Sequence, residues 1–300
     1  MTTNGPYMAI GDASEQGIGI DVIDISDPSN MQWICRIQTN HISYDINWNG
    51  NFLYDPSAYN GFYIYDISNF NNPILAYSGT GPYSIALADV AIRNNFGMFG
   101  GDEGMLIYDI TDPYSPVLEF ESNQLGFYRI ILGNDIACIM RWTLDVAILN
   151  ISQFDNPSEI SRFGHPYVCD IAMDPAESYL YLTNWDNGLA IYDISNISSP
   201  QFISETPMPG RPLCLEVCVS KIYTNYVFIA AYTGGLWAVD VTDPYNPIPT
   251  AHYVPPDQSH SVISRQDLVY LTIPGRVLSF EFDPETGTIE NGLNMPDRYL

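Results

Sequence analysis

Three of the four histidines stand directly before short apolar segments that have the length of β-strands. They are His41 before ISYDI, His165 before PYVCDI and His260 before SVIS. Acidic residues follow at roughly equivalent places within such segments, at Asp45, Asp170 and Glu216. Imidazole nitrogens and carboxylate oxygens bind divalent cations such as calcium, zinc or manganese. The six residues are therefore candidate metal ligands; the alternative is that they are polar residues hydrating a surface.

A second set of candidate residues lies in turn-forming segments and suits binding rather than catalysis. It comprises Tyr59, Asp102, Glu103, Trp142, Trp185, Asp186 and Tyr232. Tyrosine and tryptophan combine an apolar ring with a polar edge, which fits a peptide or a sugar ring. For each ring, packing inside the fold is the alternative. No nucleophile elbow, P-loop, metalloprotease helix motif or dinucleotide fingerprint occurs. The sequence therefore indicates no catalytic residue and favours a non-enzymatic protein over an enzyme.

The segments that position these residues belong to an internal repeat. Six copies superimpose without gaps: GIDVIDISDP (19–28), GFYIYDISNF (61–70), GMLIYDITDP (104–113), DVAILNISQF (145–154), GLAIYDISNI (188–197) and GLWAVDVTDP (235–244). One position in them is occupied by Asp24, Asp66, Asp109, Asn150, Asp193 and Asp240, at intervals of 42, 43, 41, 43 and 47 residues. A degenerate seventh copy at 276–284 places Glu281 another 41 residues on. The period is that of a four-stranded propeller blade.

Glycine and proline keep the same register as this acidic position. Glycine stands five residues before it in five copies, and proline stands seven residues after it in five copies. In the fifth copy, Asn187-Gly188 is a strong signal for a two-residue hairpin turn between strands. An aspartate at the end of a strand can accept backbone N–H groups across the next turn. We therefore expect the six recurrent residues to stabilise turns rather than to perform chemistry.

Each repeat predicts four short strands, and no segment has convincing helical periodicity. We therefore predict an all-β fold, a seven-bladed β-propeller of four-stranded antiparallel blades that forms a single domain over residues 1–300. The approximate blades are 1–39, 40–80, 81–123, 124–164, 165–208, 209–254 and 255–300. In a propeller the innermost strands line a channel, so the three histidines are predicted to surround one mouth of it.

The first blade is expected to begin at its second strand, near Tyr7–Ile10, and so to lack an innermost strand. The tail around Asn294–Leu300 would either supply a strand or pack across the seam.

The third strand with its turn resembles the LVIVD repeat, in forms such as LIYDITDP, AIYDISNI and WAVDVTDP. The resemblance covers essentially the whole chain, with Asn150 in place of aspartate as one departure. It implies a propeller and a place at the cell surface or outside the cell. It implies no site residue, because that family has no shared catalytic motif.

Charge narrows the choice of partner. The chain has 10 basic and 35 acidic residues and a net charge of -25. Nucleic acid is a poor partner, because binding to phosphates needs basic groups, and no apolar run predicts membrane insertion. A protein or a glycan remains, and the oligomeric state is left open.

The compartment is also left open. The single lysine agrees with the surface location that the family resemblance implies. The five cysteines match no zinc spacing, and the first residues lack a signal peptide, which favours the cytoplasm or a virion.

We expect a non-enzymatic binding or scaffold propeller that presents one channel mouth to a protein or glycan. A metal-dependent hydrolase or lyase with a divalent ion at the mouth is the first alternative. A structural subunit of a surface layer or virion is the second.

Overall fold

The computed structural model describes residues 1–14, 17–43, 45–57, 61–79, 87–101, 104–141, 145–185, 187–208, 216–219, 225–265, 267–286 and 288–294. These residues form strands and turns, with no helix among them. Accordingly, no helix in the described part of the chain has the length and apolarity needed to cross a bilayer. The chain divides into two compact units: Met1–Asp27 with Met31–Arg162, and Pro28–Asn30 with Phe163–Leu300.

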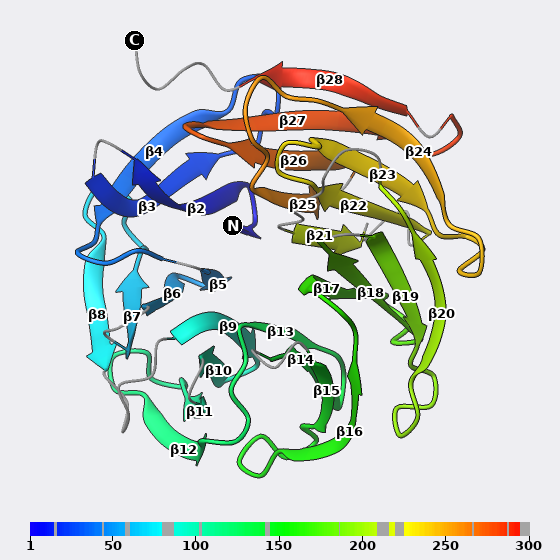
Figure 1. The fold of residues 1–300 in the computed structure, drawn as a ribbon. Helices are drawn as coiled ribbons and strands as arrows, with labels where there is room; N and C mark the ends of the chain where they lie inside the picture. The colour runs from blue at the N-terminus through cyan, green and yellow to red at the C-terminus, as the bar shows by residue number, and fades with distance from the viewer. Residues whose placement is uncertain are drawn as a thin grey trace. The chain divides into compact units, whose positions relative to one another are not determined.

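The first unit contains four sheets, each built from four consecutive strands (Figure 1). Blade 1 consists of β1 (Thr2–Asn4), β2 (Tyr7–Ser14), β3 (Gly17–Asp24) and β4 (Gln32–Gln38). Blade 2 consists of β5 (Asn47–Asn49), β6 (Phe52–Ser57), β7 (Gly61–Asp66) and β8 (Ile74–Gly79). Blade 3 consists of β9 (Leu87–Arg93), β10 (Phe96–Gly101), β11 (Gly104–Asp109) and β12 (Val117–Ser122). Blade 4 consists of β13 (Arg129–Leu132), β14 (Ile136–Met140), β15 (Asp145–Asn150) and β16 (Ser158–Gly164).

The second unit contains three sheets of the same kind. Blade 5 consists of β17 (Val168–Met173), β18 (Tyr179–Asn184), β19 (Gly188–Asp193) and β20 (Gln201–Thr206). Blade 6 consists of β21 (Glu216–Val219), β22 (Tyr226–Ala230), β23 (Leu236–Asp240) and β24 (Ile248–Tyr253). Blade 7 consists of β25 (Ser261–Arg265), β26 (Leu268–Ile273), β27 (Arg276–Asp283) and β28 (Thr288–Asn294).

The predicted fold class is confirmed: the chain is all-β and forms the seven four-stranded antiparallel blades of a β-propeller. The expectation that blade 1 lacks its innermost strand is wrong. β1 pairs with β2, with Thr3 opposite Met8. A strand of three polar residues has too little alternation to be recognised in a sequence, but pairing with β2 is enough to form it. The last tail residues, 295–300, lie outside the described part of the chain.

The recurrent residue at the end of each third strand accepts a hydrogen bond across the turn. In six blades its side-chain oxygen lies 2.8–2.9 Å from the backbone nitrogen two residues later: Asp24, Asp66, Asp109, Asn150, Asp193 and Asp240. Asn150 makes the same bond because the turn needs an acceptor oxygen and not a charge. In blade 7 the strand runs two residues beyond Glu281, and Asp283 accepts the N–H of Glu285 instead, at 2.8 Å.

Neighbouring blades pack through the apolar side chains of their second and third strands. In the first unit, Ile20 and Val22 of β3 share a buried cluster with Leu53 of β6. In the second unit, Phe228 of β22 and Phe280 of β27 belong to another. Because the middle strands are largely buried on both faces, strand ends, hairpins and outer strands are where polar and aromatic groups are expected to contact solvent.

Candidate functional site

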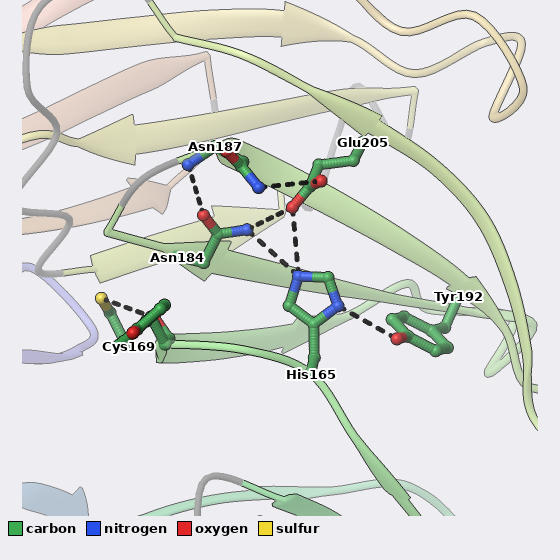
Figure 2. Close-up of polar contacts among 7 residues, drawn as sticks. His165, Cys169, Asn184, Asn187, Tyr192 and Glu205 are labelled. Carbon is green, nitrogen blue, oxygen red and sulfur yellow. Dashed lines mark hydrogen bonds and ion pairs between the residues drawn. The ribbon is translucent and has the colours of Figure 1, made fainter.

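A network of polar side chains surrounds His165, just before β17 (Figure 2). The imidazole is buried, and both of its nitrogens meet side chains of blade 5. Nδ1 lies 3.0 Å from the hydroxyl of Tyr192, and Nε2 lies 3.2 Å from Oε1 of Glu205. Burial and then the charge of Glu205 raise the pKa of Tyr192, so the phenol keeps its proton. Nδ2 of Asn184 also lies 3.1 Å from Nε2, so three side chains of blade 5 contact the ring.

Two asparagines complete this network around the carboxylate of Glu205. Asn184 Nδ2 donates to Oε1 at 2.7 Å, and Asn187 Nδ2 donates to Oε2 at 3.1 Å. The backbone N–H of Asn187 donates to Oδ1 of Asn184 at 2.6 Å, across the hairpin between β18 and β19. Glu205 thus accepts two amide donors and also contacts the His165 ring. A metal ion on His165 would have to displace Tyr192 or Glu205 from the ring.

Two exposed aromatic residues lie beside this network. Trp185 follows Asn184 directly, and its backbone N–H donates to the carbonyl of Tyr167 at 3.2 Å. Trp185 is 56% exposed and Tyr167 is 55% exposed. Tyr167 also has a φ of 56°, a conformation that costs a non-glycine residue free energy. Trp185 is recognisable in the sequence by its residue type and place in the repeat. Tyr167 is not, because no local pattern signals its backbone conformation or its proximity to Trp185.

His41 occupies a separate centre in blade 2. Its Nε2 lies 2.7 Å from Oδ2 of the fully buried Asp55, and its Nδ1 lies 3.2 Å from Oδ1 of Asn40. The ring stacks on Tyr63, with centroids 4.1 Å apart. Burial raises the pKa of Asp55, and the contact with His41 opposes that rise. This pair is closed off from solvent.

His260 lies before β25 and is exposed. Its ring meets Tyr232 edge-on at 5.9 Å. The neighbouring residue, Ser259, donates to the carbonyl of Tyr232 from its backbone and its hydroxyl, at 2.9 and 3.0 Å. The three histidines therefore have different partners. Over the described residues, no group of three or more histidine, cysteine or acidic side chains is placed to hold a metal ion. The metal assignment stays a prediction.

Two aspartates of the innermost strands bind backbone groups of the next blade. Asp170 Oδ2 accepts the N–H of Val217 in β21 at 2.7 Å. Asp89 does the same in the first unit, accepting the N–H of Ile130 in β13 at 2.7 Å. Asp89 occupies the same place in its repeat as Asp170, and this equivalence is the signal that would have found it. The side chain of Glu216 lies outside the described residues.

Asp45 of blade 2 lies next to Asp89, the aspartate that bonds Ile130. Its carboxyl is hydrogen-bonded to Asp89, and its Oδ1 lies 3.9 Å from Nη1 of Arg129. Complete burial, then the charge of Asp45, raise the pKa of Asp89 well above its usual range, while Arg129 opposes the rise. Asp89 therefore keeps its proton at a pH where an ordinary aspartate is ionised.

Asp45→Asn is expected to lower the pKa of Asp89, because the amide removes the neighbouring negative charge. In the wild type the folded state keeps a proton that the unfolded chain releases near pH 4. The free energy of unfolding therefore falls as the pH rises from about 4 through the raised pKa of Asp89. Guanidinium unfolding over this range should show a smaller fall in Asp45→Asn. An equal fall in both proteins would contradict the effect of Asp45 on the pKa of Asp89.

Of the aromatic and acidic loop candidates, the structure describes Trp185, which is exposed, and Tyr232, which contacts His260. The others fall outside the described residues: Tyr59, Asp102, Glu103, Trp142 and Asp186. Their proposed role in binding stays a prediction.

The fold is shared with solved structures of low sequence identity. A hypothetical selenium-binding protein from Sulfolobus tokodaii is 13% identical, with a TM-score of 0.74 over 97% of this chain and 90% of that one. A functionally unknown protein from Desulfotomaculum acetoxidans is 12% identical, with a TM-score of 0.71 over 95% and 98%. Hsv2 from Kluyveromyces lactis is 9% identical, with a TM-score of 0.68 over 98% and 96%. At these identities the likeness concerns the fold alone.

Sequence comparison supplies the family. No curated protein matches the chain. The family model of the LVIVD repeat matches residues 4–39, 42–80, 87–123, 167–206 and 217–254, which is more than half of the sequence. The resemblance in the third strand and its turn is thereby confirmed, and this chain belongs to the LVIVD-repeat family.

Proposed function

We propose that the protein is a non-enzymatic binding module in which blade 5 holds a neutral glycan ring against Tyr167 and Trp185. The observation that carries this proposal is the backbone hydrogen bond between Trp185 and Tyr167, two residues with exposed aromatic side chains, next to the hairpin whose Asn187 bonds Glu205. An aromatic face covers the apolar C–H face of a sugar, and neighbouring amide and carboxylate groups bond its hydroxyls.

The aromatic side of the site supports this function. Exposed tyrosine and tryptophan bury a large apolar area on binding with few side-chain torsions to immobilise. Tyr167 is held in a backbone conformation that costs about 1–3 kcal/mol for a residue with a Cβ atom. A glycine at this position would be free of that cost, so the presence of tyrosine is consistent with a role of its side chain in binding.

The polar side is preorganised. Glu205 is held by His165, Asn184 and Asn187, so a ligand need not order it. The Glu205 side chain is 26% exposed, and Asn187 is exposed. Their oxygens can accept further hydrogen bonds from ligand hydroxyls. Preorganisation of this kind lowers the free-energy cost of binding.

The net charge of -25 favours a neutral ligand over a sulfated or phosphorylated one. In blade 5, both nitrogens of His165 are engaged in holding Glu205 and Tyr192, which is a positioning role.

The test is fluorescence titration with tetramers of β-linked glucose, galactose and N-acetylglucosamine. Binding of at least one is expected, and Trp185→Ala should weaken it at least tenfold, or about 1.4 kcal/mol. Trp33→Ala is the matched control, because Trp33 is another exposed tryptophan, at 44%, on the outer strand of blade 1. No binding at millimolar sugar, or equal affinity in Trp185→Ala, would overturn the proposal.

Tyr167→Gly separates binding from stability. Removing the Cβ atom relieves the positive φ, so the unfolding midpoint should stay the same or rise. Affinity for the bound tetramer should fall about tenfold in the same variant. A loss of stability would show instead that the Tyr167 ring packs against the fold.

A further inference from the structure

A groove of about 520 Å³ lies between blades 5 and 6 in the second unit. Pro175, Tyr179 and Tyr181 form one side, and Val241 and Pro244 form the other. Tyr181 and Val241 are buried at its base. The groove lies at the Tyr179 end of β18, whereas Asn184 and Trp185 mark the opposite end. It is therefore separate from the glycan site and does not depend on that proposal.

The repeat supplies a closed counterpart of this groove in the first unit. Tyr114, in the turn before β12, donates its hydroxyl to Asp66 of blade 2. Its ring packs edge-on against Phe52, with centroids 5.8 Å apart. Tyr114 of blade 3 thus covers Phe52, at the start of the second strand of blade 2. It also provides a hydrogen-bond donor to Asp66, the aspartate of the blade 2 turn.

At the equivalent place between blades 5 and 6, the tyrosine of the turn makes no such hydrogen bond to the aspartate of the neighbouring blade. Tyr245 occupies the position of Tyr114 but is 72% exposed. Tyr179 and Asp193 replace Phe52 and Asp66. Asp193 Oδ1 accepts both the N–H and the hydroxyl of Ser195, at 2.8 and 2.6 Å. Within the described part of the chain, its Oδ2 and the Tyr245 hydroxyl have no hydrogen-bond partner.

The groups around this end of the groove are acidic and aromatic. Asp193 lies opposite Tyr179 in the pairing of β18 with β19, and Asp174 accepts the N–H of Tyr179 at 2.6 Å. Burial, and then the charges of Asp193, Tyr245 and Asp174, raise the pKa of Tyr179. The hydrogen bond from the Ser195 hydroxyl lowers the pKa of Asp193, so its carboxylate is charged at neutral pH. Proline and tyrosine walls with an ionised acid at the rim are suited to a cationic, proline-containing segment. Aromatic-lined grooves bind polyproline II helices because these are ordered before binding.

We propose that the groove binds a proline-rich peptide segment of a partner protein, with prolines against Tyr179 and Tyr245 and an arginine on Asp193. Charge complementarity supports a basic partner, since this chain has 35 acidic and 10 basic residues. The same imbalance argues against a second copy of the chain as the occupant. Guanidinium can pair with the open oxygen of Asp193 without disturbing the turn.

The test is fluorescence anisotropy with a labelled peptide of about ten residues that contains Pro-x-x-Pro and a terminal arginine. Tyr245→Ala should weaken binding about tenfold. Tyr114→Ala, the matched change at the closed position, should leave the affinity unchanged. No binding of the peptide, or equal affinity in Tyr245→Ala, would overturn the proposal.

Charge is tested by Asp193→Asn, which should keep the turn because Asn150 makes the same turn bond in blade 4. The variant should bind the peptide about fivefold more weakly and lose its preference for arginine over glutamine. Asp109→Asn is the control and should have no effect. A preference for arginine that survives in Asp193→Asn would refute the assigned pairing. Trp185→Ala should leave peptide binding intact, which distinguishes this groove from the glycan site.

Discussion

Asp170→Ala is expected to lower the free energy of unfolding by about 3 kcal/mol. Asp170 is fully buried, and its Oδ2 accepts the N–H of Val217 from the next blade at 2.7 Å. Alanine leaves that N–H without an acceptor, away from water, and also leaves a small cavity. The guanidinium midpoint should fall, and the Val217 amide should exchange with solvent much faster than in the wild type.

Asp170→Asn is the control for this prediction, since its carbonyl oxygen can still accept the bond from Val217. We expect a loss of about 1 kcal/mol for asparagine. If Asp170→Ala were as stable as Asp170→Asn, the bond between β17 and β21 would contribute little. The prediction also bears on the proposed glycan site, because His165 and Tyr167 lie just before β17.

Gly188→Ala is expected to cost about 3 kcal/mol, for two separate reasons. Gly188 has a φ of 88°, which costs a residue with a Cβ atom about 1–2 kcal/mol. An added Cβ atom would also lie 2.5 Å from the carbonyl oxygen of Thr206 and 2.6 Å from the backbone nitrogen of Met208. Both are backbone atoms next to β20, so the outer strand must shift, at a further cost of about 1–3 kcal/mol.

Gly50→Ala isolates the first of these costs. Gly50 has a φ of 58°, and an added Cβ atom there meets no other atom within 4 Å. Its variant should lose only about 1–2 kcal/mol. Chemical unfolding of the two variants measures the difference, which is the cost of moving β20. Equal losses would mean that the blade accommodates the new methyl group without strain.

Short-range chemistry in the sequence was enough to predict the blades. The turn acid bonds a backbone group two residues away, and the hairpin glycine permits a backbone angle at its own position. Both effects act within a few residues, so every copy carries its own signal. The exceptions are informative: β1 is too short to show a pattern, and Asp283 replaces Glu281 because β27 runs longer.

The candidate sites were predicted only in part. Trp185, His165 and the other histidines stood out by residue type and by their place in the repeat. Glu205 did not, because it lies 40 residues from His165, on an outer strand. Asp89 was not among the predicted site residues, although it occupies the same repeat position as Asp170.

The amino-acid sequence by itself determined the repeat, the strands and the family, because each depends on contacts between residues near one another in the chain. Only the tertiary structure decided which partners each side chain has. His165 meets Glu205, and Tyr114 covers Asp66 while Tyr245 stands open, because these contacts cross strands and blades. Such contacts depend on strand register and backbone angles, as at Tyr167, and no spacing along the chain specifies them.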